Sequence, residues 1–318
     1  MRALCKTETG VELRSLQPPQ PGPGEVVIKV MCAGLCRTDI YVAQGDLSSE
    51  LPRTLGHECS GVICRLGEGV PQEHLGERVT VFPWLGCGRC EQCLSHNLTG
   101  AAKCSLRRFL GWQEDGVFAT FLKVKESQCV ALPPSVDFQA GAYFEPLLAA
   151  LGVLVAPWKQ AVSPAILGDN RIASLTSIIL RDYARCEHKQ VVIGEAASDQ
   201  FDLLIETGAT TESLAEAFRI LKPGGVLVVK SRPARTVEWP VRLQVEKEIT
   251  ALGASYGSPE LALLLLEKKQ SLFTPLWNEP KPLGDWAEHF SPEGSGEDKK
   301  TFFLPQDTAG SVAQCVES

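Results

Sequence analysis

Two short stretches decide how this chain is read, Gly34-Leu35-Cys36-Arg37-Thr38-Asp39 and Gly56-His57-Glu58-Cys59-Ser60-Gly61. They place a thiolate and an imidazole on two separate loops. Sulfur and nitrogen ligands of this kind, completed by a carboxylate from further along the chain, suit a tetrahedral Zn²⁺ that keeps one position open for a substrate oxygen. The two stretches therefore predict a catalytic zinc site with Cys36 and His57 as ligands.

A second cluster of cysteines follows these stretches. Cys87, Cys90 and Cys93 are spaced so that one tight loop can present three thiolates, and ten residues separate Cys93 from Cys104. Four thiolates close a zinc tetrahedron and leave no open position, so the cluster predicts a structural zinc. His96 is an alternative fourth ligand. Unligated thiols at this density would be prone to oxidation.

The composition narrows the class of protein. A chain of 318 residues with 44% hydrophobic content can bury one or two cores. Its net charge of −7 argues against a nucleic-acid binder, which would need a basic face to contact phosphates. The longest apolar run, Pro146 to Trp158, is too short to cross a bilayer, and the N-terminus has no signal-peptide pattern. We therefore expect a soluble, cytoplasmic protein with reduced cysteines that binds neither nucleic acid nor membrane.

The three motifs together resemble the zinc-dependent medium-chain dehydrogenase/reductase superfamily, which includes alcohol, sorbitol and threonine dehydrogenases. The resemblance implies an α/β fold. A GroES-like, mostly β catalytic domain would span residues 1–155 and carry a structural-zinc lobe at about residues 84–110. A shortened Rossmann-like domain with a parallel sheet would span 156–270, and the C-terminal segment 271–318 would return to the catalytic domain and end in a flexible tail.

The resemblance also implies a third catalytic zinc ligand. Glu145 precedes Pro146 at an expected helix start and matches the Glu-Pro motif of the family, which would place its carboxylate in the cleft between domains. Glu58, next to His57, is a competing ligand that would exchange with water or with Glu145.

Two neighbours of Cys36 receive roles in the same way. The hydroxyl of Thr38 is expected to hydrogen-bond the substrate oxygen and begin removal of its proton. Asp39 is expected to hold the site together by hydrogen bonds rather than to bind the metal. Tyr41 stands where some relatives carry a relay histidine, so a proton path to solvent would run differently here.

The apolar pattern predicts the following strands and helices. Strands are expected at Glu25–Val30, Gly61–Cys64, Arg78–Phe82, Ser163–Gly168, Gln190–Ile193, Phe201–Ile205, Val226–Val229 and Glu248–Gly253, and after a turn at Asp115–Ala119. Helices are expected at Ile172–Ala184, Glu212–Leu221 and Ser258–Lys268. Lys222–Gly225 should stop the second of these helices, Ser291–Lys300 should be a mobile loop, and a solvated tail should begin at Gln306.

The second half is shorter than the family pattern. Only residues 195–200 separate the second strand of its sheet from Phe201, whereas a parallel pair of strands needs a crossover of about a dozen residues. The sheet must therefore lack a unit or connect its strands differently.

The expected cofactor-binding residues depart from the glycine fingerprint of the family at Asn170 and at Ala173, of which the alanine is tolerated. Gly168-Asp169-Asn170-Arg171-Ile172-Ala173 occupies the place of the dinucleotide fingerprint, and Asn170 replaces the glycine that lets the backbone touch the pyrophosphate. Glu195 is the candidate for gripping the ribose, with Arg171 or Lys189 as candidates for a 2′-phosphate. Thr207-Gly208 matches the loop on the nicotinamide side.

Two functions follow from these observations. The first is a zinc-dependent oxidoreductase that moves hydride between an alcohol or carbonyl substrate and NAD(P), with two zinc ions per chain. The alternative is a zinc enzyme that has lost nicotinamide binding and uses the metal as a Lewis acid for elimination, hydration or isomerisation. Either would act on a small molecule, and the resemblance implies a dimer or tetramer.

Overall fold

The computed structural model describes residues 1–95, 97–208, 210–290 and 299–306. The chain forms two compact units, the first from Met1–Glu145 with Leu263–Ser318 and the second from Pro146–Ala262. The sequence suggested limits at residues 155 and 270. The limits of the compact units fall at Glu145 and Ala262, within the helices α4 (Phe144–Leu151) and α8 (Pro259–Lys269).

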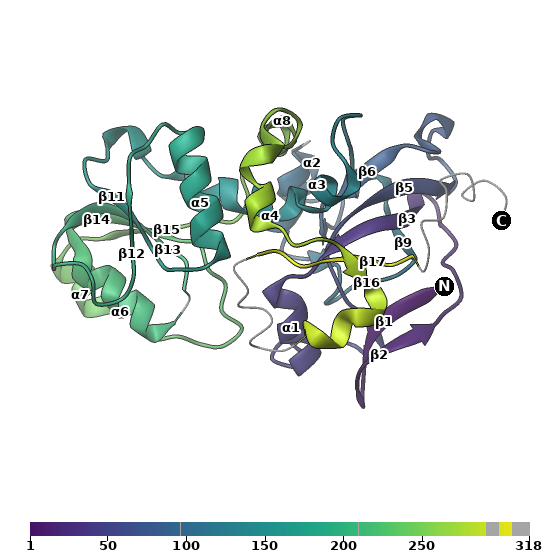
Figure 1. The fold of residues 1–318 in the computed structure, drawn as a ribbon, viewed down its shortest axis with the longest axis horizontal. Coiled ribbons are helices and arrows are strands. Elements are labelled where there is room, and N and C mark those ends of the chain that lie inside the picture. Colours follow the sequence, from purple (N-terminus) through teal and green to yellow (C-terminus); the bar gives the residue numbers. More distant parts are fainter. Residues whose placement is uncertain (96, 209, 291–298, 307–318) are drawn as a thin grey trace. The chain divides into compact units, whose positions relative to one another are not determined.

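The first unit is mostly β, as the GroES-like reading predicts. Its largest sheet has seven strands in the order β10-β6-β5-β3-β17-β16, and β9 also pairs with β3 (Figure 1). These strands are β3 (Glu25–Gly34), β5 (Glu58–Leu66), β6 (Arg78–Val81), β9 (Phe121–Lys125), β10 (Cys129–Ala131), β16 (Lys281–Pro282) and β17 (Phe302–Leu304). Alternate residues of β3, Val26, Ile28 and Val30, enter the main core of the unit.

Smaller elements complete the first unit. A three-stranded sheet has the order β2-β1-β4, and β7 pairs with β8. The bounds are β1 (Arg2–Thr7), β2 (Gly10–Ser15), β4 (Arg53–Thr54), β7 (Trp84–Leu85), β8 (Arg108–Phe109), α1 (Arg37–Gln44), α2 (Glu91–Leu94) and α3 (Phe138–Ala142). The α2 helix and a 3₁₀ turn at Leu98–Lys103 lie between β7 and β8 and form the expected cysteine-bearing lobe.

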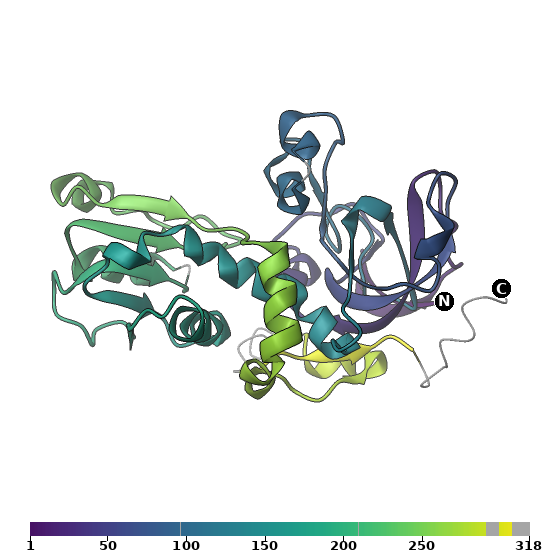
Figure 2. The same cartoon turned by 90° about the horizontal axis from the view of Figure 1, so that it is seen from above.

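The second unit is a parallel sheet of five strands in the order β12-β11-β13-β14-β15. Figure 2 shows β15 at one edge of this sheet. The elements are β11 (Pro164–Leu167), α5 (Arg171–Asp182), β12 (Lys189–Val191), β13 (Phe201–Glu206), α6 (Thr211–Ile220), β14 (Leu221–Val229), α7 (Val241–Glu246) and β15 (Thr250–Gly253).

Helices cover both faces of this sheet. Leu203 and Ile205 of β13 share a buried cluster with Ala173 and Leu180 of α5. Leu204, which points the other way because side chains alternate along a strand, shares a second cluster with α6. The predicted Rossmann-like layering is confirmed.

The missing unit of the sheet is also explained. β12 and β13 both pair with β11 and lie on opposite sides of it, so the chain crosses from one side to the other through residues 192–200. No helix lies in this crossing, whose residues are all described. The sheet has therefore lost an outer strand and the helices that flank it.

Two local predictions were only partly right. Helix α6 ends at Ile220, before Lys222–Gly225 as expected, but these four residues do not separate the helix from the next strand. They lie inside β14, opposite a register shift between Phe201 and Leu203 of β13, because glycine and proline suit a bulge as well as a helix stop. The expected strand within Asp115–Ala119 is a single bridge from Ala119 to Ala3. Of the expected loop Ser291–Lys300, residues 291–298 lie outside the described part, as does the tail after Gln306.

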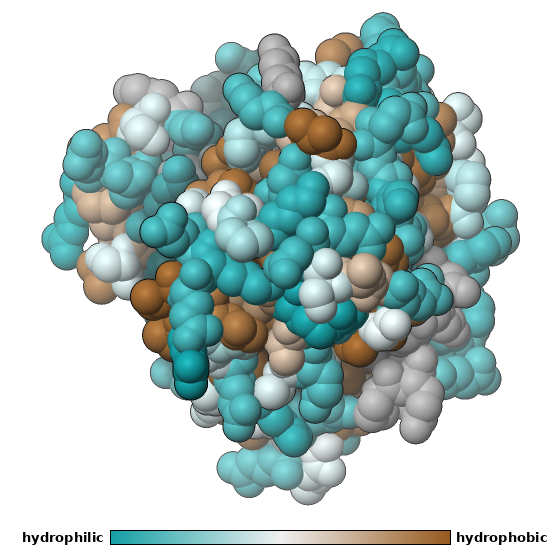
Figure 3. All heavy atoms as spheres, turned by 90° about the vertical axis from the view of Figure 1, so that its left-hand side faces the viewer, coloured by the Kyte–Doolittle hydropathy of each residue, from teal (hydrophilic) through white to brown (hydrophobic). Residues whose placement is uncertain are grey.

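The surface is mainly polar on the face shown in Figure 3, where apolar residues gather in separate patches among hydrophilic ones. Exposed apolar side chains of the second unit include Ile193, Val241 and Val245. Among the described residues, no helix is both long enough and apolar enough to cross a bilayer.

Candidate metal centre and nucleotide-binding region

The turn from β3 into α1 presents Cys36. Cys36 is the N-cap of α1 with an extended backbone (φ −117°, ψ 156°), and its backbone N–H donates to Asp39 Oδ2 at 2.9 Å. An acidic residue at the third helical position satisfies a backbone donor at the helix start in this way. The helix start therefore fixes both the thiol and the carboxylate of Asp39.

Asp39 also holds the imidazole. Its Oδ1 lies 2.9 Å from Nδ1 of His57, and both side chains are buried. A carboxylate on Nδ1 leaves Nε2 of the ring as the metal-binding nitrogen. The prediction that Asp39 holds the site together by hydrogen bonds is confirmed.

The structure brings Cys36, His57 and Glu58 into one group, in which one ligand atom from each lies within 4.8 Å of the others. His57 ends the loop before β5, and Glu58 is the first residue of that strand. Nε2 of His57 lies 3.9 Å from Oε1 of Glu58. The loop before β5 and the first residue of that strand thus provide a nitrogen and an oxygen beside the sulfur of Cys36.

The electrostatics of this group favour a cation. Burial alone would lower the pKa of His57, but the negative charges of the Asp39 carboxylate and the Cys36 thiolate outweigh burial and raise that pKa well above its usual value. These two anionic groups favour a positive charge at this buried place. A divalent cation with mixed sulfur, nitrogen and oxygen preference fits this donor set.

Glu58 has a second partner that the sequence did not predict. Nζ of Lys300 forms an ion pair with Oε2 of Glu58, and each side chain is 1% exposed. Burial raises the pKa of Glu58, and Lys300 and His57 oppose that rise. The expected mobile loop at Ser291–Lys300 was wrong at its last residue.

Strand β17 explains how Lys300 reaches the site. Phe302 and Phe303 pair with Gly34 and Ala33 of β3, and the Leu35 N–H donates to Thr301 O at 3.0 Å. A Cβ at Gly34 would collide with Oε2 of Glu58 and with Cε of Lys300, so a side chain there would displace the two ends of this ion pair.

Glu145 lies in the first turn of α4 and is 5% exposed. Its charge is close enough to contribute to the raised pKa of Glu58. It is not a member of the three-residue ligand group, so its role as the third ligand stays a prediction.

Thr38 lies on the first turn of α1. Its Oγ1 is 3.9 Å from Sγ of Cys36, so its hydroxyl borders the position that a metal on Cys36 would occupy.

The four lobe cysteines Cys87, Cys90, Cys93 and Cys104 also come together, with their sulfurs within 4.8 Å of one another. Sγ of Cys90 and of Cys93 are 3.5 Å apart, and Sγ of Cys104 accepts from the Leu106 N–H at 3.4 Å. Backbone N–H groups of Arg89 and Cys90 lower the pKa of Cys87 to about 6. Four converging thiols with N–H···S bonds fit a closed, structural zinc site. His96 lies outside the described residues.

An aromatic contact joins this lobe to the catalytic group. The ring of Phe109 on β8 lies 4.8 Å from the ring of His57, and Trp84 on β7 lies 4.5 Å from Phe109. The hairpin that frames the lobe therefore packs against a proposed catalytic ligand.

The helix start after β11 is occupied by a side chain of the protein itself. Oδ1 of Asn170 accepts from the N–H groups of Ile172 and Ala173 at 3.0 and 3.1 Å. Its Nδ2 donates to Oγ1 and O of Thr207 at 3.0 and 3.2 Å. Asn170 is thus the N-cap of α5 and uses donors that a pyrophosphate would otherwise receive.

Gly168 and Thr207-Gly208 lie at the ends of adjacent strands. Gly168 has φ +135°, and a Cβ there would collide with Oγ1 of Thr207. The buried carboxylate of Glu206 accepts from Gly208 N at 2.6 Å and from Oγ of Ser213 at 2.7 Å. The sequence did not identify Glu206, which fixes the loop that carries two expected cofactor residues.

Glu195 is exposed in the crossing after β12. Its Oε2 accepts from the Val192 N–H at 3.4 Å. The carboxylate expected at the ribose therefore engages its own turn, and its role toward a ribose stays a prediction.

Comparison with known proteins agrees with this geometry. Residues 22–134 match the family model described as the alcohol dehydrogenase GroES-like domain. The chain is 29% identical to a sorbitol dehydrogenase of Halalkalibacterium halodurans, with 96% of this chain and 100% of the relative covered. It is 28% identical to an L-threonine 3-dehydrogenase of Sinorhizobium medicae, with 70% and 66% covered.

The first alignment also bears on length. It spans 349 positions, more than the 318 residues of this chain, so parts of the relative have no counterpart here.

Solved structures share the fold at low identity. Galactitol-1-phosphate dehydrogenase from Escherichia coli superimposes with a TM-score of 0.80 at 22% identity, covering 96% of this chain and 100% of the other. Acetophenone reductase from Geotrichum candidum, solved in complex with NAD, gives a TM-score of 0.83 at 19% identity, covering 95% and 96%.

Proposed function

This chain belongs to the zinc-dependent medium-chain dehydrogenase/reductase superfamily, and from that membership we propose that it is an oxidoreductase acting between an alcohol or carbonyl substrate and a nicotinamide cofactor. The observation that carries the proposal is the convergence of Cys36, His57 and Glu58, with Asp39 behind the imidazole. Relatives named for sorbitol and threonine support an alcohol as the substrate class.

The proposed catalytic zinc would be held by Cys36 and His57 with one carboxylate. Glu145 is the ligand that the family motif supports, and Glu58 is the one whose oxygen lies nearest to the sulfur and nitrogen. When bound, Zn²⁺ polarises the substrate oxygen and lowers the pKa of a substrate hydroxyl. Lys300 would keep Glu58 paired while Glu145 serves as ligand, and would lose that partner if Glu58 moved to the metal.

Thr38 would handle the proton. Its hydroxyl lies beside Cys36 and can accept a hydrogen bond from a substrate hydroxyl while it donates its own proton onward. Because residue 41 is a tyrosine rather than the relay histidine of some relatives, the onward path would not use an imidazole at that place.

The lobe cysteines would hold a second zinc. Its role would be structural, because four thiolates leave no position for substrate. Two zinc ions per chain follow from the two groups together.

The nicotinamide cofactor fits this chain only in part. Its ring, when bound, accepts or supplies the hydride. Thr207 and Gly208 are suited to border it, whereas Asn170 occupies the helix start that would receive the pyrophosphate. That cap favours a second candidate function, a non-redox step such as elimination, hydration or isomerisation in which zinc acts as the Lewis acid.

Turnover separates the two candidates. The zinc-loaded chain is incubated with a panel of polyols and amino alcohols plus NAD⁺ or NADP⁺, and the absorbance of reduced nicotinamide is followed, with Cys36→Ala as the control. We expect reduction with at least one alcohol and none with the control. Zinc-loaded protein that reduces neither cofactor with any alcohol would contradict the oxidoreductase and favour the Lewis-acid alternative.

A further inference from the structure

The sheet of the second unit contains one complete mononucleotide-binding half and one shortened half. Dinucleotide-binding sheets consist of two mononucleotide-binding halves with the strand order 3-2-1-4-5-6. Here β13, α6, β14, α7 and β15 form a full second half, whereas the first half has only β11, α5 and β12. The outermost strand and the helices around it are absent from a stretch whose residues are all described.

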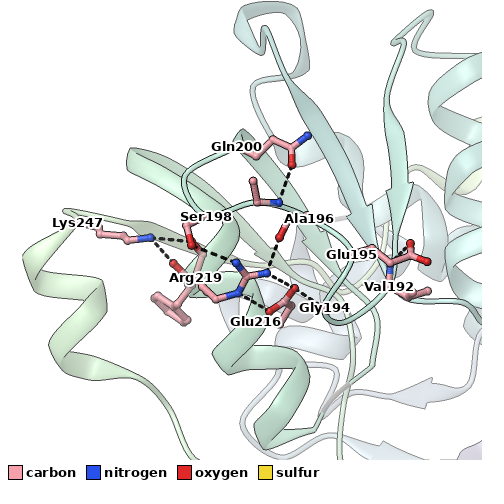
Figure 4. A network of polar contacts seen from close by, with 11 residues as sticks. Val192, Gly194, Glu195, Ala196, Ser198, Gln200, Glu216, Arg219 and Lys247 are labelled. Carbon is pink, nitrogen blue, oxygen red and sulfur yellow. Dashed lines mark hydrogen bonds and ion pairs between the residues drawn. The ribbon is translucent and has the colours of Figure 1, made fainter.

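The crossing from β12 to β13 replaces the missing strand and helices, and side-chain hydrogen bonds hold it in place (Figure 4). The Gly194 N–H donates to Oε1 of Glu216 at 2.9 Å, and Arg219 donates to Ala196 O at 2.6 Å and to Oγ of Ser198 at 3.1 Å. Glu216 and Arg219 are themselves paired on α6, at 2.7 Å. The crossing is therefore fastened to the helix that covers one face of the sheet.

Lys247 fastens the end of the same crossing. Its Nζ lies 2.8 Å from Oδ1 of Asp199 and donates to the carbonyl groups of Phe218 and Leu221 at 2.7 and 2.9 Å. Side chains from two elements thus hold residues 194–199, the stretch that stands where the missing strand and helices would begin.

The phosphate-binding site at the start of α5 is also altered, and this change is separate from the missing outer strand. Asn170 takes the Ile172 and Ala173 N–H groups for its own oxygen, and its amide group is tied to Thr207. A phosphate at this helix start would have to displace both sets of hydrogen bonds. The carboxylate of Glu195, expected at the ribose, is engaged with Val192 N–H in its own turn.

The other half is preorganised. At the carboxyl end of β13, Glu206 accepts from Gly208 N, Ser213 Oγ and Ser231 Oγ, and Oγ1 of Thr207 donates to Leu167 O at 2.9 Å. Ligands of parallel sheets bind beyond the carboxyl ends of the strands where the strand order reverses, which here is between β11 and β13. The rigid loop therefore lies at the place where one mononucleotide can bind.

We infer that this chain recognises its cofactor through the nicotinamide riboside end alone, so that the adenosine half and the phosphates add almost nothing to affinity. The inference rests on the proposed function, because it concerns the cofactor of the same site. It implies that the chain does not discriminate NADH from NADPH, whose difference lies on the adenosine ribose.

The test compares four ligands on the full zinc-loaded chain by fluorescence titration and calorimetry. They are NADH, NADPH, reduced nicotinamide mononucleotide and reduced nicotinamide riboside. We expect all four dissociation constants to agree within about fivefold, because each tenfold in affinity requires about 1.4 kcal/mol of additional contact. ADP-ribose should not compete with any of them.

Variants of Asn170 test the phosphate step. Asn170→Gly frees two N–H groups at the helix start and costs little as a cap, so the three phosphate-bearing ligands should bind about tenfold more tightly while the riboside is unchanged. Asn170→Ala, the matched control, frees the same groups but keeps a Cβ in the path of the phosphates and should gain less.

The outcomes are distinct. Binding of NADH more than about 50-fold tighter than the mononucleotide, competition by ADP-ribose, or a loss of NADH affinity in Glu195→Gln would overturn the inference and leave the oxidoreductase intact. Failure of all four ligands to bind at millimolar concentration would overturn both.

Discussion

At the scale of single residues, the most consequential feature is the buried ion pair between Lys300 and Glu58. Two charges that are each 1% exposed are tolerable only while they compensate each other. A metal beside Glu58 offers an alternative compensation for the carboxylate, so the pair couples the stability of the fold to the occupancy of the metal site.

We predict that Lys300→Met lowers the free energy of unfolding of the metal-free chain by about 3 kcal/mol, because Glu58 stays buried without its counter-ion. The loss should be smaller with zinc bound. Chemical denaturation of both forms measures the two values.

The double variant Lys300→Met with Glu58→Gln is the control for that prediction. It should recover most of the loss, since neither partner then carries a charge. Equal stability of Lys300→Met and the natural chain without metal would rule out the coupling.

The same residues show what local sequence can predict. Cys36 and His57 lie in short motifs with fixed spacing, and the four lobe cysteines lie close together along the chain, so the sequence alone predicts both groups. Lys300 was not predicted, because its partner lies far along the chain and nothing local marks a lysine as buried. Asn170 was predicted to obstruct a phosphate, but its use of its own oxygen as the cap depends on side-chain direction.

At the scale of elements, the crossing between β12 and β13 depends on Glu216. The hydrogen-bonded guanidinium of Arg219 lowers the pKa of Glu216 despite its burial. A carboxylate whose pKa is lower in the folded state stabilises the fold above the unfolded value of about 4.3, and that contribution disappears as pH falls through the folded value.

We therefore predict that Glu216→Gln costs about 1–2 kcal/mol at neutral pH, and that the difference from the natural chain shrinks as the pH falls below about 4. Thermal unfolding across this pH range measures it. Glu246→Gln, which removes the exposed pair with Arg242 on α7, should cost under about 0.5 kcal/mol and serves as the matched control. A pH-independent cost for Glu216→Gln would show that its charge is not the cause.

Elements were predicted better than their connections. Apolar runs placed β11, α5, β13 and α6 within a few residues, because burial on a sheet or helix leaves a periodic pattern. The bulge in β14 was missed, since the same residues suit a turn. The crossing at residues 192–200 was predicted to be abnormal from its length alone, but polar contacts with α6 determine the route it takes.

At the scale of the whole molecule, the two ligand groups lie in the same unit and should fill independently. We predict two zinc ions per chain by elemental analysis, with Cys36→Ala removing one and Cys87→Ala the other. Cys87→Ala should also lower the melting temperature of the first unit, because a closed thiolate site contributes folding energy directly.

The control is Cys186→Ala, because Cys186 lies outside both groups of zinc ligands. This variant should retain both zinc ions. Purified chain with less than one zinc would contradict both site assignments.

Strand β17 also has a consequence for the order of folding. It pairs with β3 although the entire second unit is inserted in the chain between them. Closing so long a connection is entropically costly while the insert is unfolded, and compaction of the insert shortens the span that must be closed. We therefore expect destabilising substitutions in the second unit to slow the folding of the first unit. Refolding kinetics of the full chain would measure this dependence.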